Sequence, residues 1–83
     1  MNVNDAAIVK SLVKLYQDEL DDVLEDYSLI CAVLGLLKEH GAPEDGDTVK
    51  NLKRRQTKIA DKMKGIQECL DIAQKELKAL EEG

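Results

Sequence analysis

Aromatic side chains are almost absent from this chain of 83 residues, which has no Phe, no Trp and two Tyr. Any hydrophobic core must therefore be built from Leu, Ile, Val, Ala and Met, a composition typical of helices. A chain of this length is too short for two independent cores or for most enzyme scaffolds. We therefore expect a single domain over residues 1–83 that is not an enzyme.

Positive charge is in deficit, because 12 Lys and Arg stand against 17 Asp and Glu for a net charge of -5. This balance argues against attraction of the whole surface to nucleic acid or to an anionic membrane. The basic run over residues 50–64 has no aromatic side chain for base stacking, so we interpret it as a solvated helix face. We expect a protein partner or a second copy of the chain, and no nucleic acid, membrane or small-molecule substrate.

Motifs for catalysis and for ligand binding are missing from the sequence. There is no GxGxxG, no phosphate loop, no GxSxG and no Cys/His metal spacing, so we expect no catalytic residue, no metal and no cofactor. Cys31 and Cys69 form neither a CxxC pair nor a disulfide framework, and we expect both to pack as small hydrophobic side chains.

Segments that would direct the chain to a membrane are also lacking. The longest apolar run, residues 29–37, is much shorter than the roughly 20 residues of a membrane span. The first five residues contain no basic segment leading into an apolar stretch, so we expect no secretory signal. With so few cysteines, these features predict a cytoplasmic protein.

Helix-breaking residues concentrate in one segment, residues 40–47, which holds the only Pro, two Gly and three acids. Gly41 suits the position just after a helix C-terminus, and Pro43 prevents the helix from continuing. We predict helices over about residues 5–40 and 48–82, joined by a connector over 41–47. Asn4 and Asp47 are the expected N-caps.

Apolar residues recur every three or four positions on both sides of this connector. The first series is Ala6, Val9, Val13, Tyr16, Leu20, Val23, Tyr27, Ile30, Leu34 and Leu37, and the second is Val49, Leu52, Gln56, Ile59, Met63, Ile66, Leu70, Ala73, Leu77 and Leu80. This spacing predicts helices with heptad seams. A short connector folds them back antiparallel, with seam residues pairing where their numbers sum to about 86. The predicted fold class is all-α, an antiparallel two-helix hairpin with a heptad seam.

A second stripe flanks the seam on the first helix. It consists of Ile8, Leu12, Leu15, Glu19, Asp22, Asp26, Leu29, Val33 and Leu36, apolar at both ends and acidic between. A single seam buries little apolar surface for a chain of this size, so we expect dimerisation or a partner to complete a four-helix bundle. In the predicted register, the basic residues nearest the connector lie beside the apolar segment at residues 29–37.

The second stripe and this basic rim define a predicted partner-binding surface. Its members are Leu12, Leu15, Leu29, Val33, Leu36, Arg55 and Lys58. An apolar patch with a basic rim is suited to an acidic, amphipathic helical segment of a partner. We expect a small acidic helical adaptor or co-chaperone, with a self-assembling four-helix-bundle dimer as the alternative.

Four short strings resemble tubulin-binding cofactor A, a family of helical chaperones for β-tubulin. Residues 8–14 (IVKSLVK) are similar to its early helix, and residues 44–46 (EDG) to its connector. Residues 51–54 (NLKR) are similar to the start of its second helix, and residues 66–69 (IQEC) to the place where that helix bends. The first arm here is about two turns longer, Gln67 stands in place of the proline at the bend, and a third helix is missing. The resemblance implies a tubulin chaperone as a further alternative, and no functional residue is carried over.

Overall fold

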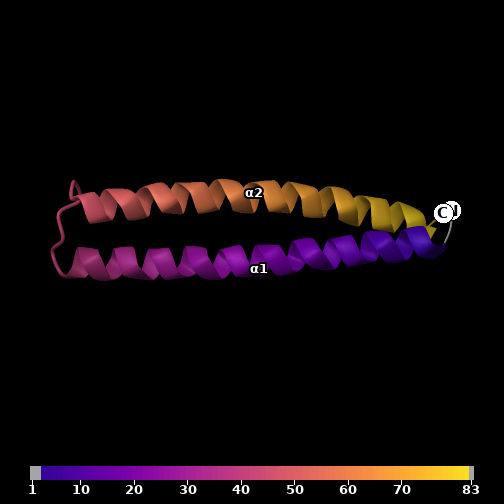
Figure 1. Ribbon diagram of the computed structural model, residues 1–83, viewed down its shortest axis with the longest axis horizontal. Coiled ribbons are helices and arrows are strands. Elements are labelled where there is room, and N and C mark those ends of the chain that lie inside the picture. Colours follow the sequence, from indigo (N-terminus) through magenta and orange to yellow (C-terminus); the bar gives the residue numbers. More distant parts are fainter. Residues whose placement is uncertain (1–2, 83) are drawn as a thin grey trace.

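A computed structural model describes residues 3–82, which form two long helices joined by a short connector. Helix α1 comprises Val3–Glu39 and helix α2 comprises Asp47–Glu82. The helices lie side by side and antiparallel, with the connector at one end and the outer ends of both helices at the other (Figure 1). The molecule is a rod with dimensions of 59 × 14 × 14 Å. The predicted all-α helical hairpin is thus confirmed.

The end of α1 is set by a left-handed glycine. Gly41 has a φ of 76°, and its N–H donates to the carbonyl oxygen of Lys38 at 3.1 Å. The N–H of Ala42 donates to the carbonyl oxygen of Leu37 at 2.9 Å. This pair of hydrogen bonds is a Schellman motif, which satisfies carbonyl groups that the last helical turn leaves free. The role predicted for Gly41 follows from this conformation.

The starts of both helices differ from the predictions. The carbonyl oxygen of Gly46 accepts from the N–H of Lys50 at 3.0 Å, so Gly46 is the N-cap and Asp47 is already helical. Gly46 also donates its own N–H to the carbonyl oxygen of Pro43 at 3.0 Å, and this turn holds it outside the helix. The predicted N-cap role of Asp47 is therefore wrong by one position, although a carboxylate in the first turn still favours the helix dipole. Asn4 is not an N-cap either, because α1 begins at Val3.

Replacing Gly41 by Ala is expected to destabilise the hairpin by about 1–2 kcal/mol, because an L side chain is strained at a left-handed φ. Gly35→Ala is the matched control, since a Cβ at Gly35 would meet no atom within 4 Å and alanine favours a helix interior by about 0.5–1 kcal/mol. Urea unfolding followed by circular dichroism measures both changes. If both substitutions changed the free energy of unfolding in the same direction, the assigned role of Gly41 as a helix cap would be contradicted.

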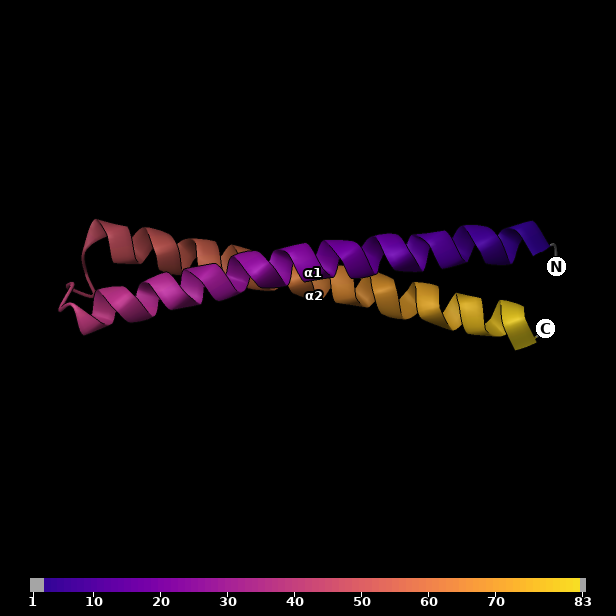
Figure 2. The ribbon, with the colours of Figure 1, turned by 90° about the horizontal axis from the view of Figure 1, so that it is seen from below.

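The predicted seam forms the interface between the helices. Every residue of both series is buried or half-buried, and the buried ones are Val13, Val23, Ile30, Val49, Ile66, Leu70 and Ala73. Val13, Leu70 and Ala73 form one cluster, with Tyr16 packed against it. Val13 shares this cluster with Ala73, the residue that the predicted register pairs with it. The helices also cross one another in Figure 2, as rods joined along a heptad seam do.

Gln56 is the only polar member of the seam, and it finds a partner across the interface. Its Nε2 donates to the Sγ of Cys31 at 3.2 Å, one residue from its predicted position opposite Ile30. Cys31 and Cys69 are both exposed, so the prediction that they pack as small hydrophobic side chains is wrong. Each cysteine is sequence-adjacent to a buried seam residue, and a single partner helix covers such flanking positions only in part.

Candidate protein-binding surface

On one side of the hairpin, the row of residues next to the seam on α1 lies beside the corresponding row on α2. Near the connector, a groove of about 230 Å³ is lined by Asp26, Leu29, Ile30 and Val33 from α1 and by Leu52, Arg55 and Ile59 from α2. Near the other end, a second groove is lined by Asp5 and Val9 from α1 and by Glu76, Ala79 and Leu80 from α2. Both grooves take the same heptad positions from each helix, so they lie on one side of the rod.

We call this side the interaction face. Its members are Asp5, Ile8, Leu12, Leu15, Glu19, Asp22, Asp26, Leu29, Val33 and Leu36 of α1, together with Arg55, Lys58, Lys62, Cys69, Ile72, Glu76 and Ala79 of α2. The large apolar side chains on it are far from covered, since Leu29 is 64% exposed and Ile72 is 63% exposed. Ile8, Leu15 and Leu36 are exposed as well. Leu24, on the opposite flank of α1, is 43% exposed.

The residues of the predicted surface divide between the two ends of this face. Leu29 and Val33 share the groove near the connector with Arg55. Val33 is half-buried there. The exposed Leu36 and Lys58 continue this end of the face.

Leu12 and Leu15 lie toward the other end of the face. Leu15 is exposed, but Leu12 is half-buried and packs against the Val13 cluster. The structure therefore places the predicted residues in two patches along the rod. A binding role for these residues remains a prediction.

Ile72 is the exposed apolar residue of this face that the sequence analysis did not single out. It lies on α2, whereas the predicted apolar stripe was drawn on the first helix alone. In an antiparallel pair, equivalent flanking rows of the two helices share a side. Extending the stripe to the equivalent positions of the second series would have found Ile72, two residues after the buried Leu70.

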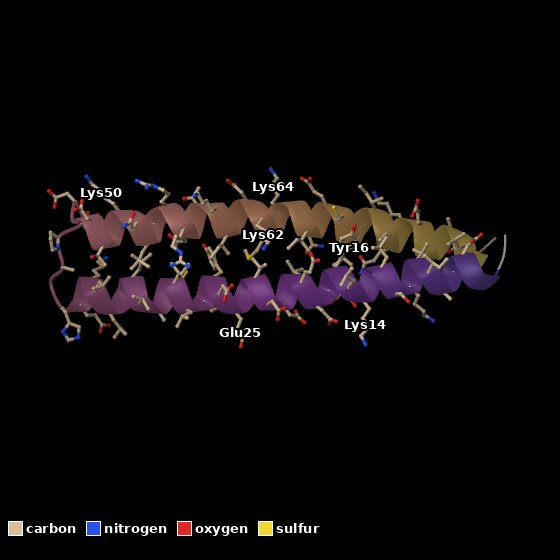
Figure 3. The ribbon with its side chains drawn as sticks, in the orientation of Figure 1. Lys14, Tyr16, Glu25, Lys50, Lys62 and Lys64 are labelled. Atoms are coloured by element: carbon tan, nitrogen blue, oxygen red, sulfur yellow. The ribbon has the colours of Figure 1, made fainter. Side chains whose placement is uncertain are left out.

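The charges at the centre of the interaction face are separated by helix. The central acids, Glu19, Asp22 and Asp26, are on α1, the bases, Arg55, Lys58 and Lys62, are on α2, and all six are exposed. Asp5 of α1 and Glu76 of α2 line the groove at the free end. Figure 3 shows Lys62 projecting into the space between the helices in that view, whereas Lys50 and Lys64 project away from α1. The face is therefore apolar at both ends, with an acidic and a basic row side by side at its centre.

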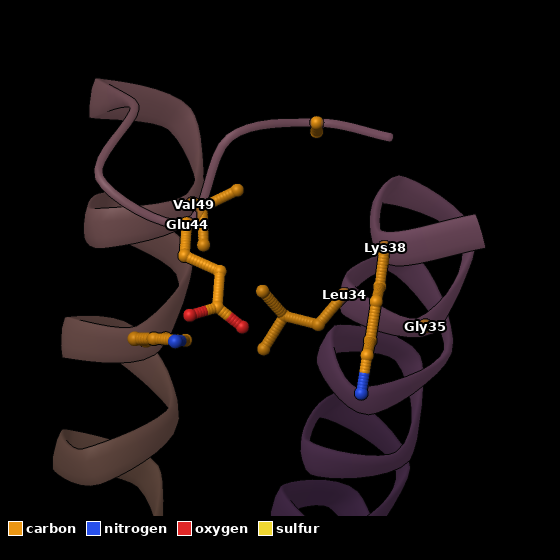
Figure 4. Close-up of a pocket in the computed structure, with 7 residues that line it drawn as sticks. Leu34, Gly35, Lys38, Glu44 and Val49 are labelled. Carbon is orange, nitrogen blue, oxygen red and sulfur yellow. The ribbon is translucent and has the colours of Figure 1, made fainter. Parts of the chain in front are cut away.

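A further cavity, of about 280 Å³, lies under the connector on the opposite flank. It is lined by Leu34, Gly35, Lys38, Ala42, Glu44, Val49 and Lys53. The Glu44 side chain extends into it from the connector, toward Leu34 (Figure 4). A ligand would have to displace this carboxylate, so we do not assign the cavity as a binding site. Among residues 3–82, no group of three or more His, Cys, Asp or Glu could hold a metal ion.

Neither described helix has an apolar stretch long enough to cross a membrane. No protein-family model matches this chain, and no curated protein or solved structure matches it significantly. The fold and the surface define a two-helix hairpin with one apolar face that is charge-separated at its centre and that no other part of residues 3–82 covers. The resemblance to tubulin-binding cofactor A rests on the four short strings alone.

Proposed function

We propose that this protein is a non-enzymatic protein–protein interaction module, a small acidic helical adaptor or co-chaperone that binds a helical segment of a partner. The observation that carries the proposal is the exposure of Leu29 and Leu36 beside the groove formed by Val33 and Arg55. Large apolar side chains gathered on one face are typical of interaction sites. Their spacing along α1 is that of a helix-in-groove contact.

The charges beside the apolar row determine which partner helices this surface would bind most tightly. Arg55 and Lys58 border the apolar row near the connector, where Asp26 is the acid among the residues that line the groove. Because the two bases outnumber this acid, a partner helix with acidic flanking residues is favoured over one with basic flanks. Apolar burial would supply most of the affinity, and charge would set orientation and association rate. A reducing, cytoplasmic setting belongs to the proposal, because both cysteines are exposed and free.

A pair of synthetic helices tests this proposal directly. Both carry Leu with i, i+4, i+7 spacing, and one has Glu flanks where the other has Lys flanks. In low salt, we expect the Glu peptide to bind at least about tenfold more tightly, a difference of 1.4 kcal/mol. Fluorescence anisotropy of the labelled peptides measures both affinities, and the preference should shrink as salt screens the exposed charges.

Two leucine variants on α1 provide the matched control. Leu29→Gln removes an apolar side chain from the interaction face, whereas Leu24→Gln removes one from the opposite flank. We expect only Leu29→Gln to weaken peptide binding, with both variants remaining helical by circular dichroism. Absence of binding to both peptides, or equal weakening by both variants, would contradict the assigned surface.

A further inference from the structure

We propose that a second copy of this chain covers the interaction face, with the two hairpins parallel and both connectors at the same end of a four-helix bundle. This inference rests on the proposed function, because it names the partner that occupies the same surface. The two hairpins would be related by a two-fold axis along the rod, which places α1 of each copy over α2 of the other. Each charged row then meets the row of opposite sign.

Charge complementarity selects this orientation. In the observed register, Asp22 and Asp26 of α1 lie at the same height along the rod as Lys58 and Lys62 of α2. The parallel arrangement therefore sets two carboxylates against two ammonium groups of the other copy, and the two-fold axis repeats the contact. Reversing one hairpin would set α1 against α1 and bring the acidic rows of both copies together, which like-charge repulsion disfavours.

The apolar ends of the face also fit a second copy. Leu15 lies at the height of Ile72 on α2, so each free end would bury Leu15 of one copy against Ile72 of the other. Near the connector, Leu29 would cover the aliphatic stems of Lys58 and Arg55 of the second copy, whose charged ends stay in solvent. Leu15, Leu29 and Ile72, which are all strongly exposed in the single hairpin, then each have a neighbour in the second copy.

The size of the face matches what a stable dimer requires. A surface 59 Å long and 14 Å wide offers about 800 Å² from each copy, which is the area per partner of a standard specific interface. A contact confined to either apolar end would offer less than half of this area. The inference therefore uses the full length of the interaction face, including its charged centre.

Charge reversal tests the pairing. We expect the wild-type chain to sediment as a dimer that dissociates more readily at high salt. The double variant Asp22→Lys/Asp26→Lys and the double variant Lys58→Glu/Lys62→Glu should each raise the dissociation constant at least about tenfold. An equimolar mixture of the two should form a heterodimer, because opposite charges meet again. Leu29→Gln should weaken the dimer, and Leu24→Gln should not.

A distance measurement tests the orientation. A spin label is attached through Glu44→Cys in the connector, in a chain that also carries Cys31→Ser and Cys69→Ser. Parallel packing puts the two labels within about 30 Å of each other, since neighbouring helices lie about 8–10 Å apart. A separation close to the rod length of 59 Å would overturn the parallel arrangement.

The outcomes separate this inference from the proposed function. A wild-type chain that remains monomeric at hundreds of micromolar would overturn the dimer, while binding of the Glu peptide to that monomer would still support the proposed function. In another outcome, the wild-type chain dimerises while its monomers, obtained by dilution below the dissociation constant, bind neither peptide. This result would contradict the proposed function and support self-association. Failure of the mixed charge variants to associate, when each is helical alone, would also overturn the dimer.

Discussion

Leu70→Asp is expected to unfold the hairpin. Leu70 is only 5% exposed and packs with Val13 and Ala73 in the main cluster of the seam. Losing a buried leucine costs about 2–5 kcal/mol, and a carboxylate without a partner in the same place adds a further penalty. Because small domains are stable by only about 5–15 kcal/mol, most of the helical circular dichroism signal should be lost at room temperature.

Leu24→Asp is the control for this experiment. It introduces the same carboxylate on a helix flank where the leucine is already 43% exposed. We expect this variant to remain folded, with a loss within about 1 kcal/mol, because surface substitutions change stability little. If Leu70→Asp unfolded no more readily than Leu24→Asp in urea, the assignment of Leu70 to the seam would be wrong.

Ala73→Leu is expected to destabilise the hairpin by about 1–3 kcal/mol, because the extra carbon atoms have no space. Ala73 is 2% exposed and is the most enclosed residue among the buried core residues. A larger side chain there must push α2 away from Val13 or adopt a strained rotamer. Thermal unfolding followed by circular dichroism should show a lower midpoint than for the unmodified chain.

Ala32→Leu makes the same change on the solvent side of α1, where the alanine is exposed. Alanine and leucine have similar helix propensities, so the midpoint should hardly move. A decrease as large as that of Ala73→Leu would show that helix propensity, and not packing against Val13, controls the effect. An increase for Ala73→Leu would show that the seam has unfilled space at this position.

The seam could be predicted from the sequence because heptad spacing is a local property of each helix. Every predicted seam position is buried or half-buried, including the polar Gln56. Gly41 and Pro43 located the connector for a similar reason, because backbone conformation at a helix end depends on nearby residues. The start of α2 was misplaced by one residue, since the turn from Pro43 to Gly46 makes Gly46 the N-cap and leaves Asp47 inside the helix.

The positions that flank the seam were harder to predict. Cys31 and Cys69 are apolar enough for a core but are exposed. Leu12, which belongs to the predicted binding surface, is half-buried against the Val13 cluster. Burial at such positions depends on where the second helix lies across the interface, which periodicity along one helix does not specify. Ile72 was overlooked for a different reason, because the predicted apolar stripe covers the first helix alone.

The amino-acid order alone determined two helices, their seam, the connector between them and a surplus of apolar residues on α1, because each of these depends on spacing within a short stretch of chain. Only the packing of α1 against α2 decided which residues beside the seam stay exposed, among them Leu15 and Leu29 of α1 and Ile72 of α2. The same packing also placed the acidic row of α1 beside the basic row of α2. Exposure and charge pairing are properties of the assembled surface, and the helices acquire them only once they pack together.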